Sequence, residues 1–320
     1  MHQLAGLADV FIHSFRPGVP ERLGIDYPQL QAINDRLVYV YAASYGSKGP
    51  QARRAAFHST PNALVGSGIL QAGAGNPPVD DSYPDPGSAL AVATAALLGL
   101  HDRERNGRGS EIETTMLASA GYMMSPYLVR YDGRDPNPMP DAGQHGFNAL
   151  YRLYPCSAGW VFVAVTDDVQ WRALVAALDL RDWSAEPTLA DRHSRVKNDD
   201  VIRARLAEVL AQRPAGEWER RSREVDAPLV AVTMDPVEEW FLEHNLLIES
   251  EHPSFGQYWR PPVKVEFDRM SARMGPAVAV GESTLEILAE LGYSEGEAAA
   301  LVDGDVVGVN QPSGSGNTSQ

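Results

Sequence analysis

Short, mostly apolar runs and helically spaced apolar positions alternate along the first part of the chain. Residues 8–13 and 38–41 predict two strands, and residues 27–37 between them predict a helix. Two strands joined through a helix form a βαβ unit, which favours a parallel sheet. A further strand is expected at 111–115, followed by a helix from 117 to about 131.

The pattern changes after residues 132–146, which are rich in Asp, Pro and Gly and form a candidate domain boundary. Strands and helices then follow in mixed order, so the sequence predicts an α/β protein with a second domain after this boundary. The other expected strands are 160–165, 229–232 and 263–267, and the other expected helices are 60–70, 169–178, 201–211, 215–225, 236–244 and 283–291.

The longest apolar run, residues 89–100, predicts a buried helix that begins at Asp85. Asp is a favoured N-cap, Pro86 suits the first helical position, and Gly107 suits the left-handed residue that ends a helix. A carboxylate at that start faces free backbone N–H groups and the positive end of the helix dipole. These groups could stabilise the carboxylate, or an oxyanion formed on its acyl derivative. The structural alternative is that Asp85 only caps the helix.

Composition narrows the classes of protein. The 320 residues carry a formal charge of −15, which argues against a nucleic-acid surface but allows a local Arg site for an anionic ligand. Cys156 is the only cysteine, which excludes an internal disulfide and fits a reducing cytoplasm. No apolar run is long enough to span a membrane and no signal peptide is recognisable, so we expect a cytoplasmic protein without a membrane partner.

Several motifs in order, from about residue 8 to 307, resemble family III CoA-transferases, the carnitine CoA-transferase-like family that includes the α-methylacyl-CoA racemases. Asp85 stands ahead of Gly107-Arg108-Gly109 at a spacing similar to that of the family's catalytic aspartate. The other matching segments are Ala8-Asp9-Val10, Phe15-Arg16-Pro17-Gly18, Glu21-Arg22-Leu23-Gly24, Gly46 with Gly49 and Pro50, residues 62–66, residues 152–160, Arg195 with Asn198, and residues 281–293.

The resemblance implies a Rossmann-like large domain, a smaller α+β domain and two interlocked subunits. We therefore expect a partial large domain at 1–135, the small domain at 136–280, C-terminal helices that return to the large domain at 281–308, and a disordered tail at 309–320. Family members carry a further N-terminal part of the large domain before the first strand here. The resemblance therefore leads us to expect a truncated or mis-started gene product, a fragment, or one piece of a split enzyme whose partner chain could supply the missing part. Residues 8–15 would form an exposed sheet edge.

The resemblance also implies the chemistry. In a family transferase the aspartate, here Asp85, attacks an acyl-CoA thioester, forms a mixed anhydride and then an aspartyl-CoA thioester, and a carboxylic acid accepts the CoA. Arg16 and Arg22 match positions that contact CoA, Phe15 packs on the adenine or beside the pantetheine, and Met116 lies near the active site. Acyl-CoA is a substrate here, and no cofactor or metal is expected. Both Arg could instead be solvated loop residues, and Met116 a core residue.

Two other functions stay open. The racemase branch uses a His and an Asp as bases on the α-proton, in a Gly-His-Asp triplet. Here Phe57 stands at the position of that His and His58 at that of the Asp, so His58 could act only with a one-residue shift. The third function is a non-catalytic CoA-binding or scaffolding subunit, which the absent N-terminal part motivates.

Overall fold

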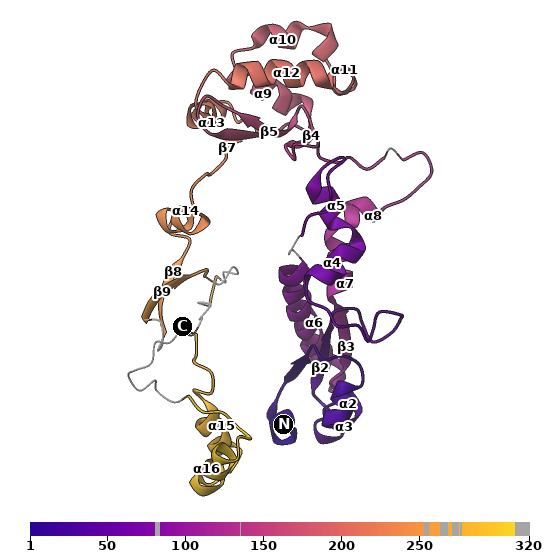
Figure 1. Ribbon diagram of the computed structural model, residues 1–320, viewed down its shortest axis with the longest axis vertical. Coiled ribbons are helices and arrows are strands. Elements are labelled where there is room, and N and C mark those ends of the chain that lie inside the picture. The colour runs from indigo at the N-terminus through magenta and orange to yellow at the C-terminus, as the bar shows by residue number, and fades with distance from the viewer. Residues whose placement is uncertain are drawn as a thin grey trace. The chain divides into compact units, whose positions relative to one another are not determined.

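Three sheets organise the part of the chain that this computed structural model describes (Figure 1). The described residues are 1–80, 84–134, 136–252, 256–262, 268–270, 275 and 277–310. They group into two compact units, residues 1–232 and 233–320. The domain boundaries expected from the sequence stay predictions.

The first sheet is parallel, as the βαβ pattern predicts. It contains β1 (Val10–His13), β2 (Val38–Ala43) and β3 (Glu111–Thr115) in that spatial order. Both pairings, β1 with β2 and β2 with β3, are parallel. The central strand β2 is buried almost throughout, and β1 is an edge strand among the described residues. Parallel pairing requires a crossover, and α2 (Val19–Leu23) and α3 (Tyr27–Ile33) provide it between β1 and β2.

Helix α6 (Pro84–Asn106) covers one face of this sheet. Ala95 packs in a core with Val38 and Val40, both fully buried. A glycine at position 99 allows the close approach, since a Cβ there would lie 2.4 Å from Val38 Cγ1. The helix ends as predicted at Gly107, which has a φ of 76° and donates its N–H to the Arg103 carbonyl at 2.8 Å.

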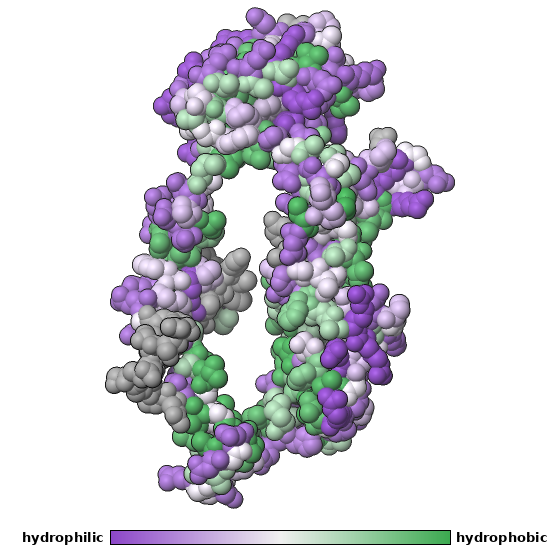
Figure 2. Space-filling view, viewed as in Figure 1, coloured by the Kyte–Doolittle hydropathy of each residue, from purple (hydrophilic) through white to green (hydrophobic). Residues whose placement is uncertain are grey.

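Two predictions about α6 are wrong. The helix already includes Pro84, so Asp85 is its second residue and not its cap; proline is well tolerated in the first turn, where it loses no helical hydrogen bond. The helix is also not buried all round. Leu90, Leu97 and Leu98 are 72%, 68% and 62% exposed, because no described segment of this unit covers that face, and apolar residues gather over α6 in Figure 2.

The second sheet is antiparallel and has its own core. Its strands are β4 (Gly146–Asn148), β5 (Tyr151–Pro155), β6 (Trp160–Ala164) and β7 (Leu229–Ala231). The helices α9 (Asp168–Ala177), α12 (Asp199–Leu210) and α13 (Ala215–Glu224) pack on it, close to their predicted ranges. Sequence patterns did not indicate β4 or β5.

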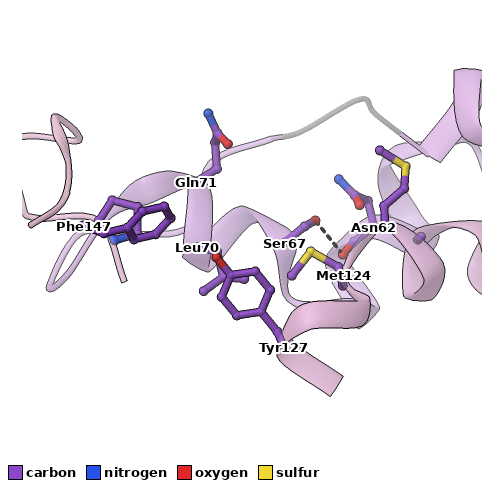
Figure 3. A pocket seen from close by; sticks show the side chains of 10 residues that line it. Asn62, Ser67, Leu70, Gln71, Met124, Tyr127 and Phe147 are labelled. Carbon is purple, nitrogen blue, oxygen red and sulfur yellow. Dashed lines mark hydrogen bonds between the residues drawn. The ribbon is translucent and has the colours of Figure 1, made fainter. Parts of the chain in front are cut away.

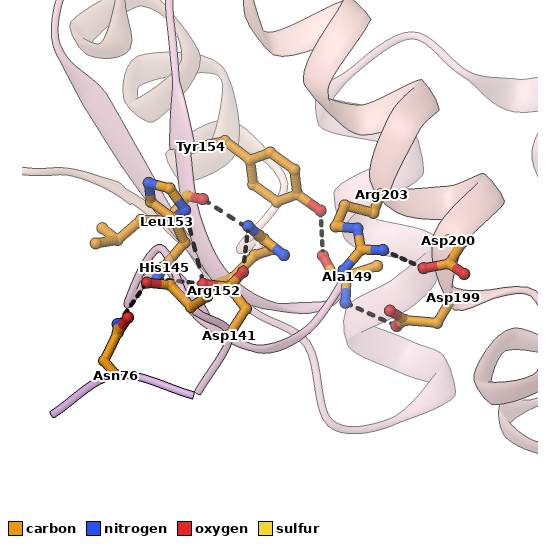
Figure 4. Close-up of polar contacts among 11 residues, drawn as sticks. Asn76, Asp141, His145, Ala149, Arg152, Leu153, Tyr154, Asp199, Asp200 and Arg203 are labelled. Atoms are coloured by element: carbon orange, nitrogen blue, oxygen red, sulfur yellow. Dashed lines mark hydrogen bonds and ion pairs between the residues drawn. The ribbon is translucent and has the colours of Figure 1, made fainter. Parts of the chain in front are cut away.

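Polar contacts at the start of this sheet join it to the preceding segment (Figure 4). Arg152 of β5 forms an ion pair with Asp141 at 2.8 Å. The Tyr154 hydroxyl donates to the Ala149 carbonyl at 2.6 Å, and Asp199 accepts the Ala149 N–H at 2.7 Å. Burial raises the pKa of Tyr154, so its hydroxyl stays a donor at neutral pH.

Two helices expected to be continuous are broken. The helix expected at 60–70 is divided into α4 (Ser59–Val65) and α5 (Ser67–Ala72) by Gly66, whose φ is 75°. The helix expected at 117–131 is divided into α7 (Met116–Met123) and α8 (Ser125–Leu128). The remaining elements of this unit are α1 (His2–Leu7), α10 (Arg181–Ala185), η1 (Pro187–Leu189) and α11 (Arg192–Lys197).

The second unit contains a β-hairpin and three helices in its described part. The elements are α14 (Val237–Glu243), β8 (Ile248–His252), β9 (Gly256–Arg260), α15 (Thr284–Glu290) and α16 (Glu295–Asp303). The predicted strand at 263–267 and residues 311–320 of the predicted tail lie outside the described residues. None of the helices described in either unit has the length and apolar character needed to cross a lipid bilayer.

Candidate active site at the carboxyl edge of the parallel sheet

A cavity of about 460 Å³ lies where the three parallel strands end. Each strand contributes to it: Ser14 follows β1, Ala43 ends β2, and Thr115 ends β3. The carboxyl edge of an open parallel sheet is where ligands bind in such folds. The full lining is Ser14, Ala42, Ala43, Asp85, Pro86, Ser88, Ala89, Val92, Thr114, Thr115 and Met116.

Asp85 enters this cavity from the first turn of α6 and is exposed. The first four N–H groups of a helix have no acceptor within the helix, and a proline residue has no N–H group. Because residues 84 and 86 are proline, the first turn presents the N–H groups of Asp85 and Gly87. The Asp85 carboxylate therefore lies at the positive end of the longest described helix.

Ser88 adds an unexpected polar group beside Asp85. It lies three residues further along α6, on the same face, and it lines the same cavity. Its hydroxyl is buried and has no hydrogen-bond partner among the described residues. A buried hydroxyl without a partner is unfavourable, so a rotation of this side chain toward the cavity would give it a hydrogen-bond partner on a bound substrate. No sequence pattern singled it out.

Met116 also lines the Asp85 cavity, from the start of α7. The Thr115 hydroxyl accepts the Ala118 N–H at 2.9 Å and so caps this helix directly after β3. The structure therefore brings together Asp85 and Met116, two of the residues singled out in the sequence.

A second cavity of about 220 Å³ adjoins the first, since Ser14 lines both. Phe15 and Arg16 line it, as do Arg54 and Tyr41. Two guanidinium groups and an aromatic ring suit a phosphate-bearing nucleotide. Arg54 was missed in the sequence; the Arg53-Arg54 pair after the glycine loop was its only signal.

The loop that leads to Arg54 is fixed by Glu113 of β3. Its two carboxylate oxygens accept the Ser47 N–H at 2.8 Å and the Ser47 hydroxyl at 2.6 Å. Gly46 precedes this contact with a φ of 96°, and a Cβ there would lie 2.8 Å from Glu113 Oε1. The glycine at position 46 is thus favoured by its backbone conformation, and a side chain there would also displace the carboxylate.

His13 packs against the start of the Phe15–Arg16 segment. Its buried ring stacks on Tyr41 at 4.8 Å and on Phe15 at 5.7 Å. Its Nδ1 accepts the Phe15 N–H at 3.2 Å, which places the proton of the neutral ring on Nε2. Burial lowers the pKa of His13, against an opposing effect of Glu21, so the ring is neutral at pH 7.

Two other predicted site residues lie apart from the Asp85 cavity. Arg22 is exposed on α2 and lines neither cavity described above. His58 immediately precedes α4, where its Nδ1 lies 3.4 Å from the Ser59 hydroxyl; it does not line the Asp85 cavity either. Phe57, which stands at the racemase His position, is 85% exposed and lines the second cavity.

The described residues offer little support for a metal site or a reactive thiol. No group of three or more His, Cys, Asp or Glu within the described ranges is placed to hold a metal ion. Burial raises the pKa of the Cys156 thiol to about 11, so it is not a reactive thiolate at neutral pH.

Comparison with known proteins identifies relatives along most of the chain. A family model described as CoA-transferase family III matches residues 1–282. The acetyl-CoA:oxalate CoA-transferase of Acetobacter aceti is 26% identical over 66% of this chain, which spans 55% of that relative's length. The (R)-2-hydroxy-4-methylpentanoate CoA-transferase of Clostridioides difficile is 23% identical over 96% of this chain and 79% of its own.

Solved structures show the same mixed α/β fold. A CaiB/BaiF family protein from Brucella suis has a TM-score of 0.72 at 22% identity, covering 91% of this chain and 77% of that one. The Mycobacterium tuberculosis protein Rv3272, in its orthorhombic form, has a TM-score of 0.75 at 22% identity, covering 88% of this chain and 77% of that one.

Proposed function

Because the chain belongs to CoA-transferase family III, we propose that it moves CoA from an acyl-CoA thioester to a carboxylic acid, with Asp85 as the nucleophile. The observation that carries this proposal is the place of Asp85. It is a carboxylate in the first turn of α6, open to a cavity at the carboxyl edge of the parallel sheet.

The first half of the reaction transfers CoA to the protein. A carboxylate oxygen of Asp85 attacks the thioester carbonyl, the C–S bond breaks, and CoA leaves as a thiolate. The product is a mixed anhydride between Asp85 and the acyl group. The thiolate then attacks the aspartyl carbonyl, which releases the donor acid as a carboxylate and leaves CoA on Asp85 as a thioester.

The second half repeats these steps in reverse. The acceptor carboxylate attacks the aspartyl thioester and expels the CoA thiolate, and the thiolate attacks the new acyl carbonyl to regenerate the Asp85 carboxylate. Each attack creates an oxyanion. We assign its stabilisation to the N–H groups of the first turn of α6 and to the Ser88 hydroxyl, since both belong to the turn that carries Asp85 and the hydroxyl has no other partner among the described residues.

The neighbouring cavity would hold the CoA nucleotide. Arg16 and Arg54 would pair with phosphates, and Phe15 offers an exposed ring for the adenine or pantetheine. Arg22, exposed on α2, could contact the outer phosphate, and Met116 would pack beside the thioester. The proposed reaction needs no further cofactor.

Racemisation is less well supported than transfer. Removal and return of an α-proton requires two bases, one on each face of the carbon. Among the described residues, Asp85 is the only titratable side chain that lines its cavity, and His58 lies elsewhere. We therefore place transfer ahead of racemisation.

We also propose that the chain works as a homodimer, or with a partner chain, in the cytoplasm. The exposed leucines on α6 leave an apolar face that association would cover, and the single, half-buried cysteine suits a reducing compartment.

Exchange of labelled CoA into acyl-CoA tests the proposal, because the first step, dissociation of the expelled CoA and reversal of that step with labelled CoA need no acceptor. Asp85→Ala should reduce exchange at least about 1,000-fold, as removal of a nucleophile does. Asp102→Ala, which removes an exposed carboxylate from the same helix, is the matched control and should exchange at the parent rate. Equal exchange by the Asp85→Ala and parent proteins would exclude the proposed mechanism.

A further inference from the structure

A third cavity, of about 230 Å³, lies among α4, α5, α7 and the segment that leads into β4 (Figure 3). One wall comes from α4 and α5, with Asn62, Ser67 and Leu70, and the Ser67 hydroxyl donates to the Asn62 carbonyl at 3.3 Å. The other residues that line it are Gln71, Ala120, Met123, Met124, Tyr127, Pro140 and Phe147.

Helix α7 connects this cavity to the one that contains Asp85. Met116, in its first turn, lines the Asp85 cavity, and Met123, two turns later, lines the third cavity. Met123 also approaches the first turn of α6, since a Cβ at Gly87 would lie 2.9 Å from the Met123 sulfur. The third cavity is therefore separated from the Asp85 turn by little more than one methionine side chain.

The lining of the third cavity contains no charged side chain among the described residues. Its polar groups are the neutral ones of Asn62, Ser67, Gln71 and Tyr127, and the rest of the lining is apolar. Two of the arginines on the adjoining segments are engaged elsewhere. Arg134 donates to the carbonyl groups of Pro126 and Val129, and Arg152 pairs with Asp141.

We propose that this cavity holds the acyl chain of the thioester attacked by Asp85, and that it selects uncharged acyl groups over those with a second carboxylate. The inference rests on the proposed transferase function and adds its substrate class. A distal carboxylate there would lose water and gain no cation, which is unfavourable. The net charge of −15 makes binding of a second carboxylate still less favourable.

The size of the cavity sets a limit on the chain. An apolar cavity of about 150 Å³ accepts benzene, so the 230 Å³ here suits a branched, aromatic or medium-length acyl group. The amide and hydroxyl groups of the lining could also form hydrogen bonds with a neutral oxygen substituent on that chain.

The test compares two donors of equal length, hexanoyl-CoA and adipyl-CoA, which differ by a terminal methyl against a terminal carboxylate. Labelled-CoA exchange is measured for each. The parent protein should favour hexanoyl-CoA in kcat/KM by at least about 30-fold, since discrimination follows the mismatch between pocket and substrate. Gln71→Arg, at an exposed position on the cavity wall, should reduce this preference about tenfold by offering the carboxylate a partner.

Gln31→Arg is the matched control. It makes the same substitution at an exposed position on α3, away from the cavity, and should keep the parent preference. Equal or better exchange with adipyl-CoA in the parent would overturn the proposed selectivity while leaving the transferase function intact. So would a Gln71→Arg protein that keeps the parent preference. Absence of exchange with both donors would instead contradict the transferase function, and the selectivity with it.

Discussion

Ser88 is the residue in the Asp85 cavity whose role is easiest to separate from stability. Its buried hydroxyl has no partner among the described residues, so Ser88→Ala should leave the free energy of unfolding unchanged or raise it by up to about 1 kcal/mol. If the hydroxyl stabilises the oxyanion, kcat for CoA exchange should fall about 10- to 100-fold. Thermal melts and exchange kinetics on the same sample measure both effects.

Ser222→Ala provides the contrast. The Ser222 hydroxyl, on α13, is buried 2.8 Å from both the Glu219 and Leu229 carbonyl oxygens, either of which can accept its proton, and it does not line the Asp85 cavity. This variant should lose about 1 kcal/mol of stability and keep the parent kcat. A Ser88→Ala protein that exchanges CoA at the parent rate would remove Ser88 from the mechanism.

His13 predicts a pH dependence of stability. Burial lowers its pKa in the folded protein, whereas the unfolded chain protonates near the ordinary value of 6.5. Below that pH the unfolded state binds more protons, so the free energy of unfolding should fall as the pH drops. Replacing the ring by Phe removes this contribution, and His13→Phe should lose less stability than the parent between pH 7.5 and 5. If thermal melts show that His13→Phe loses as much stability as the parent over this pH range, the assigned effect of burial is contradicted.

Prediction from sequence reached some of these residues and not others. The motif order identified Asp85 and Met116 as site residues, and the structure places both in one cavity. Arg54 and Ser88 escaped notice because their significance is three-dimensional: one lines a cavity with Arg16, and the other lacks a partner only once the helix is packed. The catalytic and binding roles of all four stay proposals.

Among the elements, the contact between α6 and β2 depends on Gly99. A Cβ there would lie 2.4 Å from Val38 Cγ1 and 2.7 Å from Ile112 Cδ1. Gly99→Ala should therefore destabilise the protein by about 1–3 kcal/mol through overpacking. Gly216→Ala on α13, where a Cβ meets nothing within 4 Å, should instead stabilise by up to about 1 kcal/mol. Denaturant titration measures both changes, and a destabilised Gly216→Ala with a neutral Gly99→Ala would refute this packing.

Elements with strong patterns were predictable. Apolar runs identified β1, β2 and β6, although β1 is only partly buried, and apolar spacing identified α9, α12 and α13 within a few residues. Local exceptions to these patterns were not predictable. The break at Gly66 depends on a left-handed backbone, and β5 places Arg152 in a buried position. A buried arginine does not read as a core residue until its partner Asp141 is known.

At the scale of the whole molecule, the exposed face of α6 predicts association. Leu97 and Leu98 are more than 60% exposed, a costly arrangement for a monomer. We expect light scattering to give twice the mass of one chain, and the double variant Leu97→Glu with Leu98→Glu to give a single-chain mass. Val169→Glu, at an equally exposed valine on α9, should not change the mass. A parent protein that runs as a single chain at micromolar concentration would contradict the dimer.

The arrangement of the whole molecule was the least predictable scale. The parallel sheet and the mixed α/β class followed from the order of elements, and the match to family structures confirms that class. The expected domain boundaries, the interlocked dimer and the return of the C-terminal helices depend on contacts between distant segments, which local patterns do not encode.

The most direct test of the account is to trap the covalent intermediate. The protein is incubated with acyl-CoA and then hydroxylamine, which converts an aspartyl anhydride or aspartyl thioester into a hydroxamate, and peptides are mapped by mass spectrometry. The account predicts a hydroxamate on Asp85 that depends on acyl-CoA and is absent from the Asp102 peptide. An unmodified Asp85, in a sample that exchanges CoA, would contradict the central claim.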